Sequence, residues 1–168
     1  MIMEPSRPEP SCTGGEREQL TGFLDFLRAT VRWKCGGLSD EQARRVLVPS
    51  ELTTIAGLLA HLTYVEHFWF CVVLDGRPDP WAEALAADRD AEFRAAQRTP
   101  VATLLAGYER QCAASREIAA GLELAEERTG GERTVNLRYV LVHMIEETGR
   151  HAGHLDLLRE LTDGLTGE

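Results

Sequence analysis

Apolar residues recur at helical spacing along four long stretches of the chain, which cover residues 16–34, 53–74, 99–120 and 136–161. In the first stretch, Leu20, Leu24 and Leu27 lie three or four positions apart, as on one face of an α-helix. No segment of the chain has a convincing strand pattern. The pattern predicts an all-α fold, a four-helix bundle.

Residues with strong preferences for helix ends bound these stretches. Gly36 and Gly37 end the first helix, and Thr53 or Thr54 begins the second. Thr99 caps the third, with Pro100 at its first helical position. We also expect a short amphipathic helix over residues 39–45, which opens at Ser39.

The connection between the second and third long helices is polar and rich in alanine. Residues 81–98 within it predict a further helical stretch. The connection is long enough to cross over the bundle, so the topology need not alternate simply up and down.

Residues 1–15 contain proline, serine and glycine but no apolar core, which excludes a secretory signal. We interpret them as a disordered leader before a single domain at residues 16–168. No apolar run approaches the ~20 residues that span a bilayer. We therefore expect a cytoplasmic protein, with its four scattered cysteines as free thiols.

The formal net charge of −9 narrows the choice of partners. Nucleic acids and anionic membranes both attract basic surfaces, so neither is expected to bind here. A small molecule or another protein is the expected partner. A homodimer is an option that the sequence leaves open.

The last helix carries a polar pair on its apolar face. His151 falls near the centre of that face, between Met144 and Leu155, and Glu147 precedes it by one turn. A buried carboxylate is costly unless a partner compensates its charge. Side chains four residues apart on a helix both reach one cation, so the pair predicts ligands for a divalent metal.

The second helix offers a third ligand, His61, at the border of its apolar stripe. Glu66 lies toward the buried side, where it would orient a ligand histidine or pair with Arg138. His67 faces the opposite way and is expected to be solvated. The simpler interpretations are a satisfied core histidine at 61 and a hydrogen bond within the last helix.

His154 follows the predicted pair by one turn and has several interpretations. It would replace Glu147 as a ligand, relay a proton, or cap the site.

Two stretches resemble a known family: LLAHLTYVEHFWF at residues 58–70 and HMIEETGRHAGHLDLLRE at residues 143–160. They are similar to the DinB-like metalloprotein superfamily, especially its thiol-dependent S-transferase branch, over about residues 16–164. The resemblance implies a four-helix bundle that holds a metal, often zinc, through His61, Glu147 and His151. Many members have histidine at the position of Glu147, and glutamate there is similar to mycothiol-dependent isomerases.

The resemblance implies an S-transferase that conjugates a small thiol, mycothiol or a similar one, to an electrophile through a zinc-bound thiolate. His154 or Glu66 would accept the thiol proton. A single lysine among many arginine, alanine and glycine residues indicates a GC-rich genome, which agrees with the actinobacteria that make mycothiol. The alternatives are a non-catalytic protein that binds a metal or small ligand, and a metal-dependent hydrolase.

Overall fold

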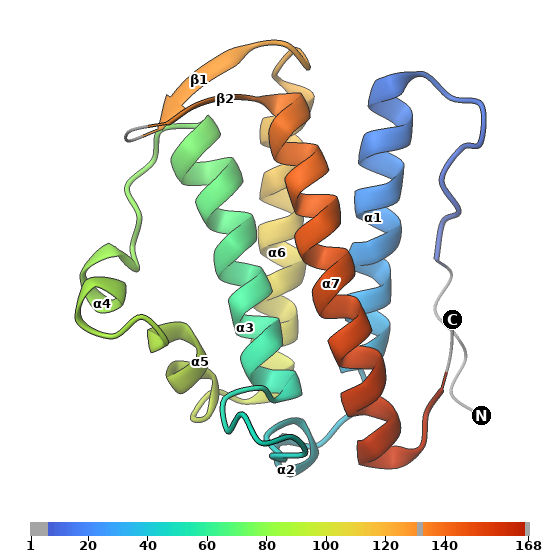
Figure 1. Cartoon of the computed structure of the whole chain (residues 1–168), viewed down its shortest axis with the longest axis vertical. Coiled ribbons are helices and arrows are strands. Elements are labelled where there is room, and N and C mark those ends of the chain that lie inside the picture. Colours follow the sequence, from blue (N-terminus) through green and yellow to red (C-terminus); the bar gives the residue numbers. More distant parts are fainter. Residues whose placement is uncertain (1–6, 131–132, 167–168) are drawn as a thin grey trace.

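The computed structural model describes residues 7–130 and 133–166, and this part of the chain is mostly helical. Its long helical segments lie side by side in Figure 1: α1 (Glu16–Cys35), α3 (Ile55–Glu66) with its continuation η1 (His67–Leu74), α6 (Val101–Ala120) and α7 (Leu137–Asp163). α1 packs on α7, and α3 packs on α6 and α7. The predicted all-α class is therefore confirmed in its broad form.

The core lies between these helices and consists of the apolar stripes that the sequence predicted. Leu24 on α1, Leu62 on α3, and Met144 and Leu155 on α7 are all fully buried. Each such side chain contributes about 1.5–3 kcal/mol through removal from water. The core therefore fixes the rotation of α3 and α7, which decides where their polar residues lie.

Most helix ends follow the capping residues. Ser39 forms a capping box at the start of α2 (Asp40–Ala43), and the Thr54 hydroxyl accepts a hydrogen bond from the Gly57 amide at the start of α3. At α6 the prediction is wrong by one residue, since Pro100 precedes the helix rather than opening it. The Val101 amide instead donates to Asp40 Oδ1 at 2.7 Å, so another helix satisfies this end.

The second predicted helix reaches Leu74 as expected, but its last part winds as a π-helix, η1. The connection that follows contains two short helices, α4 (Ala82–Ala87) and α5 (Ala91–Ala96). Figure 1 shows this connection along the outer side of α3, and α5 packs directly on α3. The connection is thus part of the wall around α3.

A small hairpin joins α6 to α7, although no segment of the sequence has a convincing strand pattern. β1 (Glu127–Gly130) pairs antiparallel with β2 (Arg133–Asn136), with Glu127 opposite Asn136. Gly130 lies so close to η1 that a Cβ there would be 2.9 Å from the Val73 Cα. Glycine is therefore the residue that lets the hairpin pack on η1.

The predicted leader, residues 1–15, falls partly outside the described residues, since 1–6 are not described. Residues 7–15 form no helix or strand, yet they lie against α1. The Arg7 guanidinium is 4.7 Å from the centroid of the Trp33 ring and 5.1 Å from that of Phe26. Cation–π attraction therefore holds Arg7 against α1.

The expectation that no apolar run could span a bilayer is wrong by length and composition. The run Ile55–Leu74 has 20 residues and contains an 18-residue stretch with a mean hydropathy of 1.4, because leucine, valine and aromatic side chains outnumber its few polar residues. In the structure 61% of that stretch is buried inside the protein, as in a core helix.

Candidate metal centre

Three side chains from two helices converge where α3 packs on α7. They are His61 from α3, and Glu147 and His151 from α7, and one ligand atom from each lies within 4.8 Å of the others. Glu147 Oε1 is 3.2 Å from His61 Nε2 and 3.1 Å from His151 Nε2. The structure thus brings together the three residues that the sequence singled out as ligands.

Local packing explains why they meet. Glu147 and His151 are four residues apart, so they project from one side of α7. Leu155, on the same side of α7, is fully buried, as is Leu62 next to His61 on α3. These leucines fix both helices so that the polar groups face one another at the edge of the core, with side chains about one-fifth exposed or less.

The electrostatics of the group favour a negative carboxylate and a positive charge beside it. Hydrogen bonds to His151 and His61 hold the pKa of Glu147 far below its usual value. Burial alone would lower the pKa of His61, but hydrogen bonds to Glu147 and Glu92 outweigh it and raise that pKa. The site therefore attracts a cation, which is either a proton on His61 or a metal ion.

Glu92 is a site residue that the sequence analysis missed. It lies on α5, is 3% exposed, and places Oε1 3.1 Å from His61 Nδ1. A neutral imidazole carries one N–H, whereas His61 has a carboxylate oxygen at each ring nitrogen. One N–H donor is therefore missing. A divalent metal at Nε2 would take its place, because the single proton then stays on Nδ1 and bonds to Glu92. The donor set therefore fits a metal ion of the zinc type.

His154 lies beside the group. It is exposed, and its Nδ1 is 3.3 Å from His151 Nδ1, the ring nitrogen that does not face Glu147. His151 thus contacts Glu147 through one nitrogen and His154 through the other.

Glu66 does not join the group. Arg28 from α1 donates to its two carboxylate oxygens, each at 2.7 Å, and both side chains are buried. The predicted pair of Glu66 with Arg138 is wrong, because Arg138 lies at the exposed start of α7 and pairs with Glu16 instead. Arg28 reaches Glu66 across the core, which spacing along one helix cannot reveal.

His67 was expected to be solvated, and this prediction is also wrong. Its Nδ1 lies 3.2 Å from Gln111 Oε1 on α6, and its Nε2 is buried. The reason is that η1 packs on α6, so the side of the helix that looked free in the sequence is covered.

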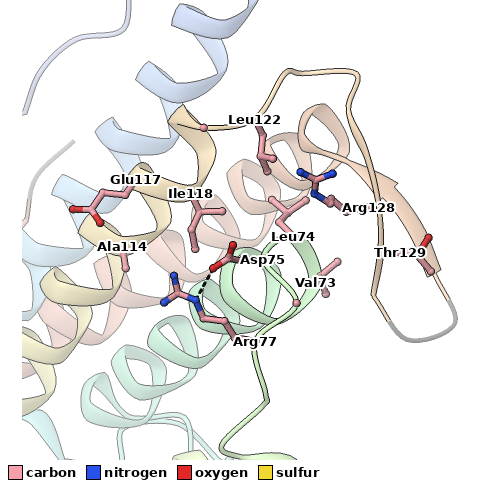
Figure 2. Close-up of a pocket in the computed structure, with 12 residues that line it drawn as sticks. Val73, Leu74, Asp75, Arg77, Ala114, Glu117, Ile118, Leu122, Arg128 and Thr129 are labelled. Atoms are coloured by element: carbon pink, nitrogen blue, oxygen red, sulfur yellow. Dashed lines mark hydrogen bonds and ion pairs between the residues drawn. The ribbon is translucent and has the colours of Figure 1, made fainter.

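A hollow of about 600 Å³ opens elsewhere, between the ends of η1 and α6 and the hairpin (Figure 2). Its lining includes Ile118, Leu122 and Arg128, together with an ion pair between Arg77 and Asp75. None of the three convergent side chains lines it. The hollow and the metal centre are therefore separate features.

The fold and the convergent group define a mostly helical protein with a histidine–glutamate group that could hold a divalent metal. The sequence matches the model of the mycothiol-S-transferase family over residues 19–164, and the protein belongs to this family. The resemblance to the thiol-transferase branch is thereby confirmed. No curated protein matches the chain.

Proposed function

We propose that the protein is a zinc-dependent mycothiol S-transferase of the cytoplasm. The observation that carries the proposal is the convergence of His61, Glu147 and His151 in a chain that belongs to the mycothiol-S-transferase family. The four long helical segments would be the DinB-like four-helix bundle, from residue 16 to 168, and the α4–α5 connection its crossover.

The three side chains would hold the metal through His61 Nε2, His151 Nε2 and a Glu147 oxygen. Three protein ligands are typical of catalytic zinc sites, which keep a position for substrate. A bound zinc ion would supply Lewis acidity that favours the thiolate form of a thiol. The group is partly exposed, which gives a small thiol access to it.

His154 is the residue that we propose as proton acceptor. Its imidazole is exposed and lies beside His151, with the two Nδ1 atoms 3.3 Å apart. The thiol S–H bond would break, and its proton would pass to the unprotonated ring nitrogen of a neutral His154. The sulfur electron pair forms the new S–C bond, and the leaving group departs with the electrons of the bond it breaks.

Glu66 was the other residue expected to accept this proton, and the proposal gives it a different role. Both its oxygens already accept hydrogen bonds from Arg28, and it is fully buried. We assign it to the stability of the bundle.

Other properties of the chain support the proposed compartment and the proposed class of substrate. Cys12, Cys35, Cys71 and Cys112 are free thiols, as suits a reducing compartment. The net charge of −9 disfavours nucleic acids and anionic membranes as partners. The substrates would be the small thiol and an electrophile. The amino-acid composition, with one lysine and many arginine, alanine and glycine residues, is typical of a GC-rich genome and agrees with an actinobacterial source.

The test uses purified protein, stripped of metal and then titrated with zinc. We expect one zinc ion per chain, and conjugation of chlorodinitrobenzene that requires both zinc and mycothiol, followed by absorbance of the product. Mycothiol with a methylated sulfur is the matched control and should give no product. Zinc-dependent turnover without a thiol would instead indicate a hydrolase, and zinc binding without turnover of any electrophile would indicate a binding protein.

A further inference from the structure

The crossover connection places a buried carboxylate beside the metal centre. Glu92 is 3% exposed, its Oε1 lies 3.1 Å from His61 Nδ1, and its Oε2 is buried with no hydrogen-bond partner among the described residues. Burying a carboxylate without full compensation is costly. A carboxylate kept in such a place therefore calls for a positive charge on or next to His61.

The contact determines which end of the imidazole is available. An ionised carboxylate only accepts hydrogen bonds, so an N–H···O contact with Glu92 puts a proton on His61 Nδ1. The Glu147 oxygen at Nε2 also only accepts, so Nε2 calls for a second proton or for a metal ion that takes its lone pair. In the second case the proton stays on Nδ1, hydrogen-bonded to Glu92. This is the arrangement in which a carboxylate orients a histidine ligand and increases its basicity.

Phe93, the next residue of α5, fixes the plane of the same ring. The Phe93 and His61 rings stack with centroids 5.0 Å apart and planes 20° apart. Gly57, one turn before His61, leaves room for this ring, since a Cβ there would come within 2.9 Å of Phe93 Cδ1. The hydrogen bond and the stacking together leave the ring little freedom to turn.

α5 has only six residues, yet its contacts with the rest of the protein hold Glu92 beside His61. Ala96 is buried at its end, and Gln97 Nε2 donates to the Thr54 hydroxyl at the start of α3 at 3.2 Å. The connection is thus tied to the helix that carries His61.

We propose that Glu92 is a positioning residue of the metal centre, which holds the His61 proton on Nδ1 so that Nε2 faces the ion. The inference rests on the proposed function, because it presupposes that His61 is a ligand. It assigns part of the metal centre to the crossover connection, in addition to α3 and α7.

The first experiment compares zinc affinities, measured by competition with a chelating dye, for the full chain and three variants. Glu92→Leu removes the acceptor, and we expect zinc to bind about 10–100-fold more weakly. Glu92→Gln keeps an oxygen acceptor and should recover most of the affinity. Glu83→Leu, an exposed glutamate of α4, is the matched control and should bind zinc like the parent.

The second experiment detects the proton itself by NMR of the zinc-loaded protein. We expect a slowly exchanging Nδ1 proton on His61 in the parent and in Glu92→Gln, with a different chemical shift in each. The signal of this proton should be lost in Glu92→Leu. A change of general stability would not move this signal selectively. Phe93→Leu should retain the signal, since it removes the stacking and leaves the hydrogen bond.

The outcomes separate the two proposals. A parent protein that binds no zinc would overturn the proposed function. A parent that binds zinc, together with a folded Glu92→Leu variant of equal affinity or with an unchanged Nδ1 proton, would overturn the role of Glu92 alone. Should the leucine variant not fold, Glu92→Asp provides the same comparison, because it keeps the charge and withdraws the oxygen by one carbon–carbon bond. Equal affinity in that variant would also count against the proposal.

Discussion

Two polar groups on the same helix, His61 and Glu66, have opposite surroundings. Glu66 is fully buried and accepts from Arg28 with both oxygens, so one ion pair satisfies its charge and its hydrogen bonds. His61 is about one-fifth exposed and lies between two carboxylates, one of which it shares with His151. In the first arrangement one cation balances one carboxylate, whereas in the second two carboxylates face two imidazoles, which attracts a cation.

This difference shows that burial of a charged group does not by itself indicate a functional site. Glu66 is the more deeply buried of the two, and its pairing with Arg28 leaves it nothing further to bind. A site is indicated where several ligand atoms converge and their hydrogen bonds and charges do not balance. Variants of each group test whether the two differ in this way.

The largest effect is expected for His151→Ala. Removal of this ligand should weaken zinc binding at least ~100-fold and abolish thiol transfer. The free energy of unfolding of the metal-free protein should fall by about 1–3 kcal/mol, because Glu147 loses one of its hydrogen bonds at a site that is mostly shielded from water. Zinc titration, initial rates and denaturant unfolding measure the three quantities.

His154→Ala is the control for this variant, since it removes the neighbouring imidazole and leaves Glu147 and His151 in place. We expect it to bind zinc within a few-fold of the parent and to transfer the thiol more slowly. Loss of zinc in His154→Ala combined with its retention in Glu147→Ala would show that His154, rather than Glu147, is the ligand.

Glu66→Ala tests the complete ion pair. It leaves Arg28 charged and buried without its main partner, so we expect the free energy of unfolding to fall by about 3–5 kcal/mol. The folded fraction should still bind one zinc ion per chain. Urea unfolding and metal analysis of the native protein measure both effects. A variant of unchanged stability that has lost its zinc would place Glu66 in the metal centre.

A smaller effect is expected from pH, because the protonation of His61 and Glu147 changes the stability of the protein. In metal-free protein the raised pKa of His61 contributes stability that is complete below its ordinary value of 6.5 and is lost as the pH rises through the raised value. The lowered pKa of Glu147 contributes stability above its ordinary value of 4.5, which is lost as the pH falls further. The contribution of the pair is therefore largest at about pH 4.5–6.5.

Zinc needs an unprotonated His61, so protons compete with it within this window. Zinc at 100 times its dissociation constant adds about 2.7 kcal/mol, which raises the Tm of a domain of this size by roughly 5–10 °C. We expect a shift of that size near pH 8 and a much smaller one at pH 5 with the same zinc concentration. Thermal unfolding with and without zinc measures it. An equal shift at both pH values would exclude His61 as a ligand.

The parts that the sequence predicted are those that local patterns determine. The ends of α1, α3 and α7 follow from glycine and capping residues, and Glu147 and His151 lie together because they are four residues apart on one helix. The rotation of each helix could be predicted because its apolar stripe must face the core.

The parts that were missed depend on contacts between distant segments. Glu92 lies in an alanine-rich connection without a periodic pattern, so nothing in the sequence ties it to His61, which it meets 31 residues away in the chain. The Arg28–Glu66 pair spans 38 residues and two helices. His67 is half-buried because η1 packs on α6, and an apolar run does not reveal that its winding changes to a π-helix.

The smallest effect is expected for the cysteines of the chain itself. Burial raises the pKa values of Cys35 and Cys112 to about 12, so both thiols stay protonated near neutral pH and resist alkylation. Cys12 is exposed and should react alone in the native protein, whereas all four cysteines should react after unfolding. Cys12→Ser should leave the transfer rate within the error of the assay, because the attacking sulfur belongs to the added thiol. A large loss of rate in Cys12→Ser would assign the nucleophile to the chain and remove the need for a cation at His61.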